Sequence, residues 1–194
     1  MMDKRRKPYT IVQFAGFFVV LFSITSGNDA AGLIDKGCSS EFSRLDVRID
    51  GQAIVCGNVY SLEKVGGSHI PEIQFSSASN TKKYTVVMID PDAPSNSRPT
   101  QRSWLHYLAV NIEGSDIQNF VSLSDSLSST VEYNPPTPPG GSGLHRYIIY
   151  VLQQSGSVNP GSFFQRGKFK IDKFVEDHSL TPVASNMFKT EQVE

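Results

Sequence analysis

The sequence predicts a mostly β protein with one folded domain, and three observations support this prediction. Short runs of β-branched and aromatic residues alternate with turn-rich stretches, helical periodicity is weak, and no repeat or long linker divides the chain. The 194 residues, of which 39% are hydrophobic, are sufficient for one buried core and argue against wholesale disorder. The formal net charge of −1 gives no overall attraction to nucleic acid.

The N-terminus has the pattern of a secretory signal peptide. A basic cluster at residues 4–7 precedes an apolar run at residues 11–24, and small residues follow up to Gly27. The apolar run is shorter than the roughly 20 residues that a membrane-spanning helix needs. We therefore expect residues 1–27 to be a signal peptide and residues 28–194 to form a secreted, extracellular domain. The alternative is an uncleaved signal anchor, which would hold the domain on a membrane.

The chain has two cysteines, Cys38 and Cys56. An even number of cysteines in a secreted protein favours a disulfide. We therefore expect these two to be bonded, and the alternative is a pair of separately buried thiols.

Several stretches have the patterns of strands. They are residues 45–49, 70–75, 84–89, 104–112 and 147–152, with a short edge strand at residues 121–124. The first alternates polar and apolar residues and ends at Asp50 and Gly51, a pair that is typical of hairpin turns. Residues 84–89 are β-branched or apolar almost throughout, which indicates a central strand buried on both faces.

The helical signal is confined to the C-terminal region. Residues 172–178 have the composition of a short helix, and Pro182 prevents that helix from continuing far beyond it. We expect one further helical turn after Asn186.

Three polar clusters lie at the ends of predicted strands. They are Asp90 with Asp92, Trp104 with His106, and His145 with Tyr147. Residues two apart in a strand point to the same side, so each of the last two pairs shares a face. Two proline-rich segments, residues 90–99 and 133–143, are rigid loops of the kind that hold binding groups at strand ends. The clusters converge if these strands are neighbours.

Three kinds of chemistry can use such a set of residues. Histidine and tyrosine can donate to an anion while a carboxylate orients the imidazole, which makes an anion pocket. Two histidines with carboxylates also suit a divalent metal. The third possibility is acid–base catalysis by Asp90 and Asp92, or a Ser-His-Asp relay that uses Ser95 or Ser142. No HExxH, paired CxxC or GxSxG motif occurs, so the anion pocket is favoured and Arg146 is expected to be a structural ion-pair partner.

Three blocks of the sequence carry a resemblance to a known family. They are Asp90-Pro91-Asp92-Ala93-Pro94-Ser95, Trp104-Leu105-His106 and Gly143-Leu144-His145-Arg146-Tyr147. In this order they resemble the signature motifs of the phosphatidylethanolamine-binding protein family, which includes the Raf kinase inhibitor protein of animals and the flowering regulators of plants. Residues 166–169 and 182–184 add to the resemblance, which extends from residue 45 to residue 188.

The resemblance implies a β-sandwich with a large central antiparallel sheet, a smaller sheet and a few short helices. It also implies cis peptide bonds at Ala93–Pro94 and Arg102–Ser103, and a pocket for phosphate or a phospholipid head group. The residues of that pocket would be Asp90, Pro94, Trp104, His106, Pro138, Pro139, His145 and Tyr147.

The function implied is therefore binding of a phosphate-bearing ligand by a secreted monomer, with no catalysis, no cofactor, no metal and no nucleic acid. The alternative is an extracellular serine-protease inhibitor or signalling modulator that acts on a protein partner through the pocket rim.

Overall fold

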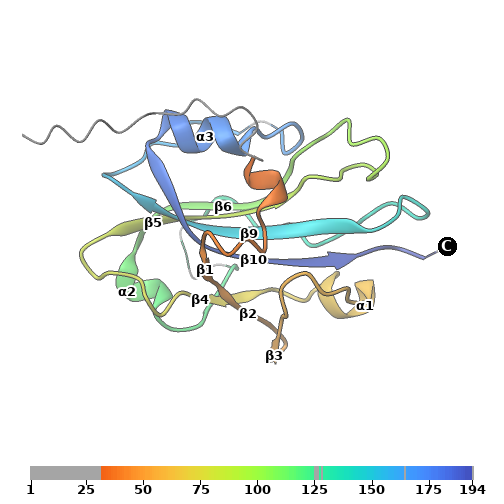
Figure 1. Ribbon diagram of the computed structural model, residues 1–194, viewed down its shortest axis with the longest axis horizontal. Coiled ribbons are helices and arrows are strands. Elements are labelled where there is room, and N and C mark those ends of the chain that lie inside the picture. Colours follow the sequence, from red (N-terminus) through yellow and green to blue (C-terminus); the bar gives the residue numbers. More distant parts are fainter. Residues whose placement is uncertain (1–31, 125–126, 128, 164, 194) are drawn as a thin grey trace, which may run out of the picture. The chain divides into compact units, whose positions relative to one another are not determined.

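The computed structural model describes residues 32–124, 127, 129–163 and 165–193. These residues form two β-sheets that pack face to face, with short helices around them (Figure 1). The expected signal peptide, residues 1–27, lies outside the described residues and stays a prediction.

The larger sheet has six strands. In spatial order they are β1 (Ser43–Arg44), β10 (Leu180–Thr190), β9 (His145–Gln154), β5 (Lys83–Asp90), β6 (Trp104–Glu113) and β8 (Ser129–Val131). All neighbours are antiparallel except β1, which runs parallel to β10. The expected large antiparallel sheet is therefore confirmed, and its one parallel pair, β1 with β10, makes the sheet mixed. Antiparallel pairing is natural for strands joined by a hairpin, and β1 reaches the edge of the sheet from a loop far from β10 in the sequence.

The smaller sheet has four antiparallel strands. In spatial order they are β3 (Gln52–Ala53), β2 (Asp46–Ile49), β4 (Glu72–Gln74) and β7 (Val121–Ser122). Asp50 and Gly51 join β2 to β3 with φ angles of 51° and 72°, and this left-handed pair makes the predicted hairpin turn. The predicted edge strand near Val121 is confirmed as β7, at one side of this sheet.

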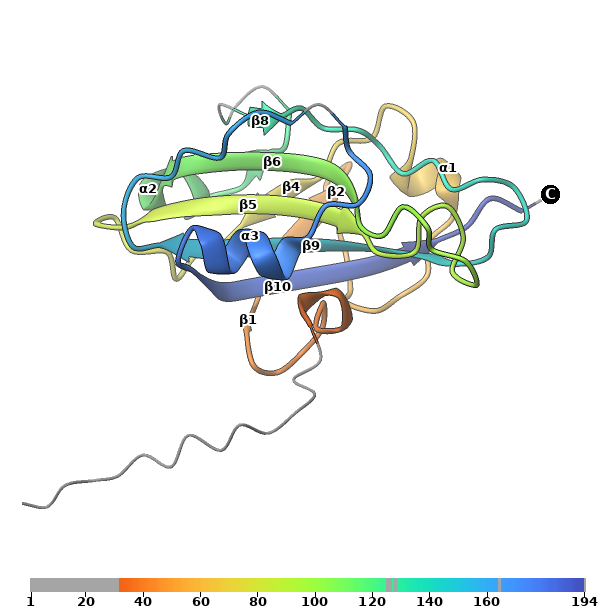
Figure 2. The same ribbon diagram turned by 90° about the horizontal axis from the view of Figure 1, so that it is seen from above.

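The core lies on both faces of β5. Val86 and Met88 point into the space between the two sheets, whereas Val87 and Ile89 point to the opposite face. That opposite face is covered by α3 (Ile171–Asp177), which lies over the large sheet in Figure 2. All four side chains have 0% exposure, so the prediction of a strand buried on both faces is confirmed.

The remaining helices are short, as expected. They are η1 (Leu33–Asp35, a 3-10 turn), α1 (Leu62–Val65) and α2 (Gly114–Ile117). The helix predicted at residues 172–178 is confirmed as α3, but the helical turn predicted after Asn186 was wrong, because β10 continues to Thr190. Pro182 lies inside that strand where its register shifts, a position that tolerates the missing N–H. No helix in the described part of the chain has the length and apolar character to cross a bilayer.

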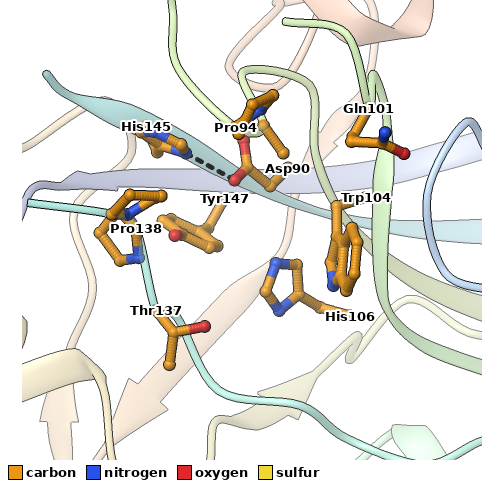
Figure 3. Close-up of a pocket in the computed structure, with 11 residues that line it drawn as sticks. Asp90, Pro94, Gln101, Trp104, His106, Thr137, Pro138, His145 and Tyr147 are labelled. Carbon is orange, nitrogen blue, oxygen red and sulfur yellow. Dashed lines mark hydrogen bonds and ion pairs between the residues drawn. The ribbon is translucent and has the colours of Figure 1, made fainter. Parts of the chain in front are cut away.

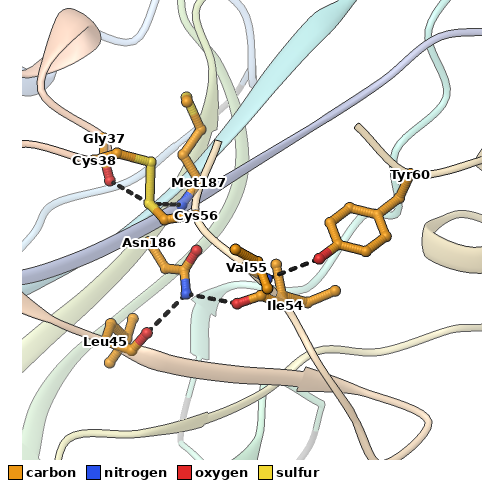
Figure 4. The surroundings of a disulfide bond; sticks show 9 residues. All are labelled: Gly37, Cys38, Leu45, Ile54, Val55, Cys56, Tyr60, Asn186 and Met187. Carbon is orange, nitrogen blue, oxygen red and sulfur yellow. Dashed lines mark hydrogen bonds between the residues drawn. A yellow bond between two sulfur atoms is a disulfide. The ribbon is translucent and has the colours of Figure 1, made fainter. Parts of the chain in front are cut away.

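Cys38 and Cys56 form a disulfide, with their Cα atoms 5.9 Å apart (Figure 4). The bond lies beside β10, where the Met187 amide donates to Sγ of Cys56. From there the chain follows the outer edge of β10, with a backbone bridge between Val59 and Lys189. The predicted disulfide is therefore confirmed, and it indicates an oxidising environment for the domain.

Candidate functional site

The order of strands explains why three distant segments meet at one place. β5 lies between β9 and β6 and is antiparallel to both, so its last residues lie beside the first residues of each neighbour. Asp90 pairs with Trp104, and Ile89 pairs with Ile148. The polar clusters that the sequence places at three strand ends therefore share one end of the large sheet.

A cavity of about 230 Å³ opens at this end of the sheet (Figure 3). Its lining contains all eight predicted residues: Asp90, Pro94, Trp104, His106, Pro138, Pro139, His145 and Tyr147. Sequence reasoning missed three further lining residues, Ala93, Gln101 and Thr137. Ala93 and Thr137 could have been predicted, because each directly precedes a proline that was predicted to line the pocket. Gln101 lies between the first two sequence motifs and belongs to neither.

Two cis peptide bonds lie in the loop between β5 and β6. They join Ala93 to Pro94 and Arg102 to Ser103, where the family resemblance implied them. This loop contributes Pro94 and Gln101 to the cavity lining.

His106 lies at a β-bulge. Ile89 pairs with Leu105 and the adjacent Met88 pairs with Tyr107, which leaves His106 as an extra residue in β6. A bulge of this kind redirects side chains and is common beside binding sites. Here Leu105 and Tyr107 enter the cores on opposite faces of the sheet, while the side chain of His106 lines the cavity.

Hydrogen bonds to the main chain fix the tautomer of His106. Its Nδ1 lies 2.6 Å from the carbonyl oxygen of Asn134, which only accepts, so Nδ1 carries a hydrogen and donates it. The Asn134 amide donates in return to the His106 carbonyl, to which Arg166 also donates. Burial lowers the pKa of His106 to about 4, although Asn134 and Asp90 act in the opposite direction. At neutral pH the ring is therefore neutral, with a lone pair on Nε2.

The second histidine of the cavity, His145, lies between Asp90 and Ser142 and is hydrogen-bonded to both. Nδ1 of His145 lies 2.7 Å from Oδ2 of Asp90, and its Nε2 lies 3.0 Å from Oγ of Ser142. The single hydroxyl hydrogen of Ser142 is donated to the Pro139 carbonyl, so Oγ is left to accept from His145. The imidazolium form, which donates from both nitrogens, satisfies this arrangement.

Asp92 and Arg146 form a structural ion pair outside the cavity, as expected for Arg146. Asp92 is fully buried and accepts from Nε and Nη2 of Arg146 at 2.8 Å each, and from its backbone amide at 3.0 Å. Burial acts to raise the pKa of Asp92, but these hydrogen bonds outweigh it and leave the pKa below its usual value. Arg146 also donates to the Ile34 carbonyl, and this bond connects η1 to the beginning of β9.

Tyr147 forms an aromatic wall of the cavity. Its ring stacks on Phe188 of the neighbouring β10 with centroids 5.3 Å apart, and meets the ring of His106 edge to face at 5.1 Å. Burial, with a smaller effect from Asp90, raises the pKa of Tyr147, so at neutral pH its hydroxyl keeps its hydrogen and can donate it.

The described residues that line the cavity include no lysine or arginine. Their ionisable groups are Asp90, His145, His106 and Tyr147. Asp90 and His145 are hydrogen-bonded to each other. His106 is therefore the cavity group that can take up a proton when an anionic ligand binds. The arrangement can therefore bind a small oxyanion through neutral donors and through a proton on His106.

The alternative chemistries find little support in this geometry. In the described part of the chain, no group of three His, Cys, Asp or Glu side chains is placed to hold a metal ion. Ser95 is half-buried and accepts from the Arg98 amide, and it does not line the cavity. Ser142 is close to His145, but its hydrogen points to Pro139, opposite to the direction that a nucleophile activated by histidine requires.

Comparison with known proteins gives one family. A model of that family, described as phosphatidylethanolamine-binding protein, matches residues 46–188. A solved structure of a phosphatidylethanolamine-binding protein from Plasmodium vivax has a TM-score of 0.66 at 21% identity, and the match covers 83% of this chain and 93% of that one.

Two further solved structures have the same fold. A carboxypeptidase Y inhibitor, solved in complex with its cognate proteinase, matches with a TM-score of 0.63 at 24% identity, over 76% of this chain and 82% of that one. The solution structure of CG7054 matches with a TM-score of 0.63 at 26% identity, over 78% and 86% of the two chains.

Proposed function

The chain belongs to the phosphatidylethanolamine-binding protein family, and on that premise we propose that it binds a small phosphate-bearing ligand, such as a phosphatidylethanolamine head group, in the cavity at the end of β5. The cavity of about 230 Å³ is smaller than the roughly 300–1,000 Å³ typical of drug-sized ligands. This size supports entry of a head group or free phosphate, with any acyl chains left outside.

One relationship supports the proposal more than any other. Nε2 of His106 and the ring of Tyr147 face a single hollow (Figure 3). Three prolines, a tryptophan and an alanine form the apolar part of its walls, and the polar part is Asp90, Gln101, Thr137 and His145. Polar groups that converge in a mostly apolar hollow are the usual design of small-ligand sites. The Asn134 carbonyl and the Phe188 ring hold His106 and Tyr147 in place before any ligand arrives.

Calorimetry with phosphorylethanolamine tests this function. We expect His106→Ala to abolish binding without unfolding the domain, because it removes the imidazole whose Nε2 faces the cavity, whereas both nitrogens of His145 already have partners in the protein. His69→Ala is the matched control, since His69 pairs with the surface residue Asp50 away from the cavity. Equal affinity of the His106→Ala chain and the parent chain would refute the site.

We further propose that the site binds without catalysis. The direction of the Ser142 hydroxyl supports this, because Oγ accepts from His145 and therefore has no base to take its proton. A measurable turnover of p-nitrophenyl esters or phosphates that is lost in Ser142→Ala would refute it.

Secretion is part of the same proposal. The disulfide supports an oxidising compartment, and the basic and apolar residues 4–24 have the pattern of a signal peptide. Mass spectrometry of the natively produced protein would identify its first residue, and a chain that begins at Met1 would contradict cleavage.

The second candidate function is protease inhibition through the pocket rim, for which the fold also provides a precedent. The similar structure of a carboxypeptidase Y inhibitor was solved with its proteinase. An inhibitor would form a stable complex with a serine protease whatever the cavity holds, whereas a head-group binder would not. Size-exclusion chromatography with a protease, with and without phosphorylethanolamine, separates the two functions.

A further inference from the structure

We propose that the groove beside the start of α3 is a second binding site, and that it takes a sulfated glycan chain. This α3 groove has a volume of about 330 Å³ and is lined by three cationic side chains, Arg102, Lys170 and Lys173, together with Ser103 and Asp172. It shares no lining residue with the cavity at the end of β5, so the inference goes beyond the proposed ligand. It rests on the proposed function only for secretion, which brings the domain to sulfated glycans outside the cell.

Two segments that are distant in the sequence build the α3 groove. Ser103 and Phe169 exchange backbone hydrogen bonds of 2.9 and 3.3 Å, as opposed residues of an antiparallel pair do. Their neighbours Arg102 and Lys170 are thereby brought together in the lining of the groove. Lys168 is also exposed on the second segment, so the positive surface is longer than the groove itself. A chain that carries sulfates on successive sugars can use this length.

Arg102 and Lys170 lack a carboxylate of their own. Nη2 of Arg102 lies 3.8 Å from Oδ1 of Asp92, but Arg146 already donates to the same oxygen at 2.8 Å. Lys170 is exposed and forms no ion pair with any residue that the structure describes. Both side chains therefore have charge available for an anionic partner.

The other two charged residues of the groove change its net charge only in part. Lys173 pairs with Asp177 at 2.7 Å, and an exposed pair of this kind holds its members weakly. Asp172 is the carboxylate of the lining, and its Oδ1 accepts from the Leu33 amide at 2.9 Å. The groove is therefore positive in a chain whose formal net charge is −1, so attraction of an anion must arise locally.

A buried hydroxyl in the groove calls for an acceptor. Ser103 is 1% exposed, and its Oγ has no hydrogen-bond partner among the described residues. Its side chain is on the same side of the backbone as that of Leu105, two residues later, which packs in the core beneath α3. Buried hydroxyls are normally paired, so this one needs a partner that the described chain does not supply. With the N–H groups of Arg102 and Lys170 it offers donors to the oxygens of a sulfate group.

The surroundings of the groove favour a glycan over a membrane or a nucleic acid. In the part of the chain that is described, the exposed large hydrophobic side chains are Val55, Val59 and Val193, and none of them lines the groove. Binding in a membrane interface needs apolar side chains beside the cations. Binding of single-stranded nucleic acid uses free aromatic rings for stacking, but the Phe169 ring packs against Phe174 with centroids 5.4 Å apart.

Calorimetry with a heparin-derived hexasaccharide in about 0.15 M salt tests the inference. We expect Lys170→Gln/Lys173→Gln to weaken binding about tenfold or more, because two cations that face the sulfates are lost. The dependence of affinity on salt should also become less steep. Lys82→Gln/Lys83→Gln is the matched control. It changes the net charge equally, and Lys83 has an exposed acidic partner as Lys173 does, but it lies at the start of β5 outside the groove.

Two single substitutions test the groove with opposite signs. Asp172→Asn should tighten binding about fivefold, because it removes a negative charge beside the sulfates and keeps an oxygen to accept from the Leu33 amide. Ser103→Ala should weaken binding between about twofold and tenfold. Its unfolding temperature should not fall, because the hydroxyl has no partner to lose. Unchanged affinity in both variants would overturn the assignment of the groove.

The outcomes separate this inference from the proposed function. His106→Ala should bind the hexasaccharide as the parent chain does, and phosphorylethanolamine should not displace it, whether or not the cavity binds a head group. No binding of the hexasaccharide, equal weakening by the two double variants, or equal binding of a desulfated hexasaccharide would overturn the inference. Binding to vesicles of phosphatidylserine and phosphatidylcholine that is lost in Lys170→Gln/Lys173→Gln, without hexasaccharide binding, would assign the groove to a membrane and would also overturn it.

Discussion

His106 and the main chain of Asn134 hold each other through two hydrogen bonds, one from the His106 ring and one between the two main chains. Nδ1 of His106 donates to the Asn134 carbonyl at 2.6 Å, and the Asn134 amide donates to the His106 carbonyl at 2.9 Å. These bonds join the bulge in β6 to the proline-rich loop that forms the opposite side of the cavity. The same pair of residues therefore sets both the tautomer of the histidine and the position of a cavity wall.

The first prediction concerns the stability of the ligand-free protein at low pH. The pKa of His106 is about 4 in the folded protein and near 6.5 when the chain is unfolded. At a pH between these two pKa values, His106 binds a proton in the unfolded chain but not in the folded chain. The contribution of His106 to the unfolding free energy is therefore complete above pH 6.5 and is lost as the pH falls toward 4. The loss should total about 3 kcal/mol of unfolding free energy.

Urea unfolding of the parent chain and of His106→Gln, in phosphate-free buffers from pH 4 to pH 7, isolates this effect. All other titrations are common to both chains, so the difference in unfolding free energy between them should shrink as the pH falls. A difference that is constant over this range would show that His106 is not held neutral in the fold.

The second prediction concerns the ion pair of Asp92 and Arg146. Asp92→Ala removes three hydrogen bonds and leaves the guanidinium, which is only 22% exposed, without its main partner. We expect the unfolding free energy to fall by about 3 kcal/mol. In Asp177→Ala, which breaks the exposed pair with Lys173, the unfolding free energy should be nearly unchanged. Equal effects of the two substitutions in chemical denaturation would argue against a structural role for Asp92.

The third prediction concerns the disulfide. Cys38 and Cys56 are 18 residues apart, and opening a loop of this length is expected to lower the unfolding free energy by about 3 kcal/mol. The double variant Cys38→Ser/Cys56→Ser should therefore unfold at the same temperature as the parent chain whose disulfide has been reduced. Free-thiol labelling of the unreduced, denatured parent chain should find neither cysteine, and labelling of both would show that the bond is absent.

Much of the fold could be predicted because burial leaves a periodic trace in the sequence. The central strand β5 is apolar on both faces, and the turn at Asp50 has a characteristic residue pair. The parallel pairing of β1 could not be predicted, because two exposed residues carry no periodicity. The length of β10 was missed because Pro182 normally argues against a strand, and its tolerance depends on a register shift that only the pairing with β9 reveals.

The site was easier to predict than parts of the fold. Its polar residues stand at strand ends, and antiparallel neighbours bring those ends together. Three features needed the structure. The bulge at His106 has no signal in the sequence, Gln101 belongs to no motif, and the low pKa of His106 depends on burial by groups that are distant in the chain.

A crystal structure of the domain grown with phosphorylethanolamine near pH 5.5 is the most direct test of the account. The account predicts the phosphorus atom inside the cavity, with one phosphate oxygen within hydrogen-bonding distance of Nε2 of His106 and close to the ring of Tyr147. A phosphate bound elsewhere on the protein, while this cavity is filled only by solvent, would contradict it.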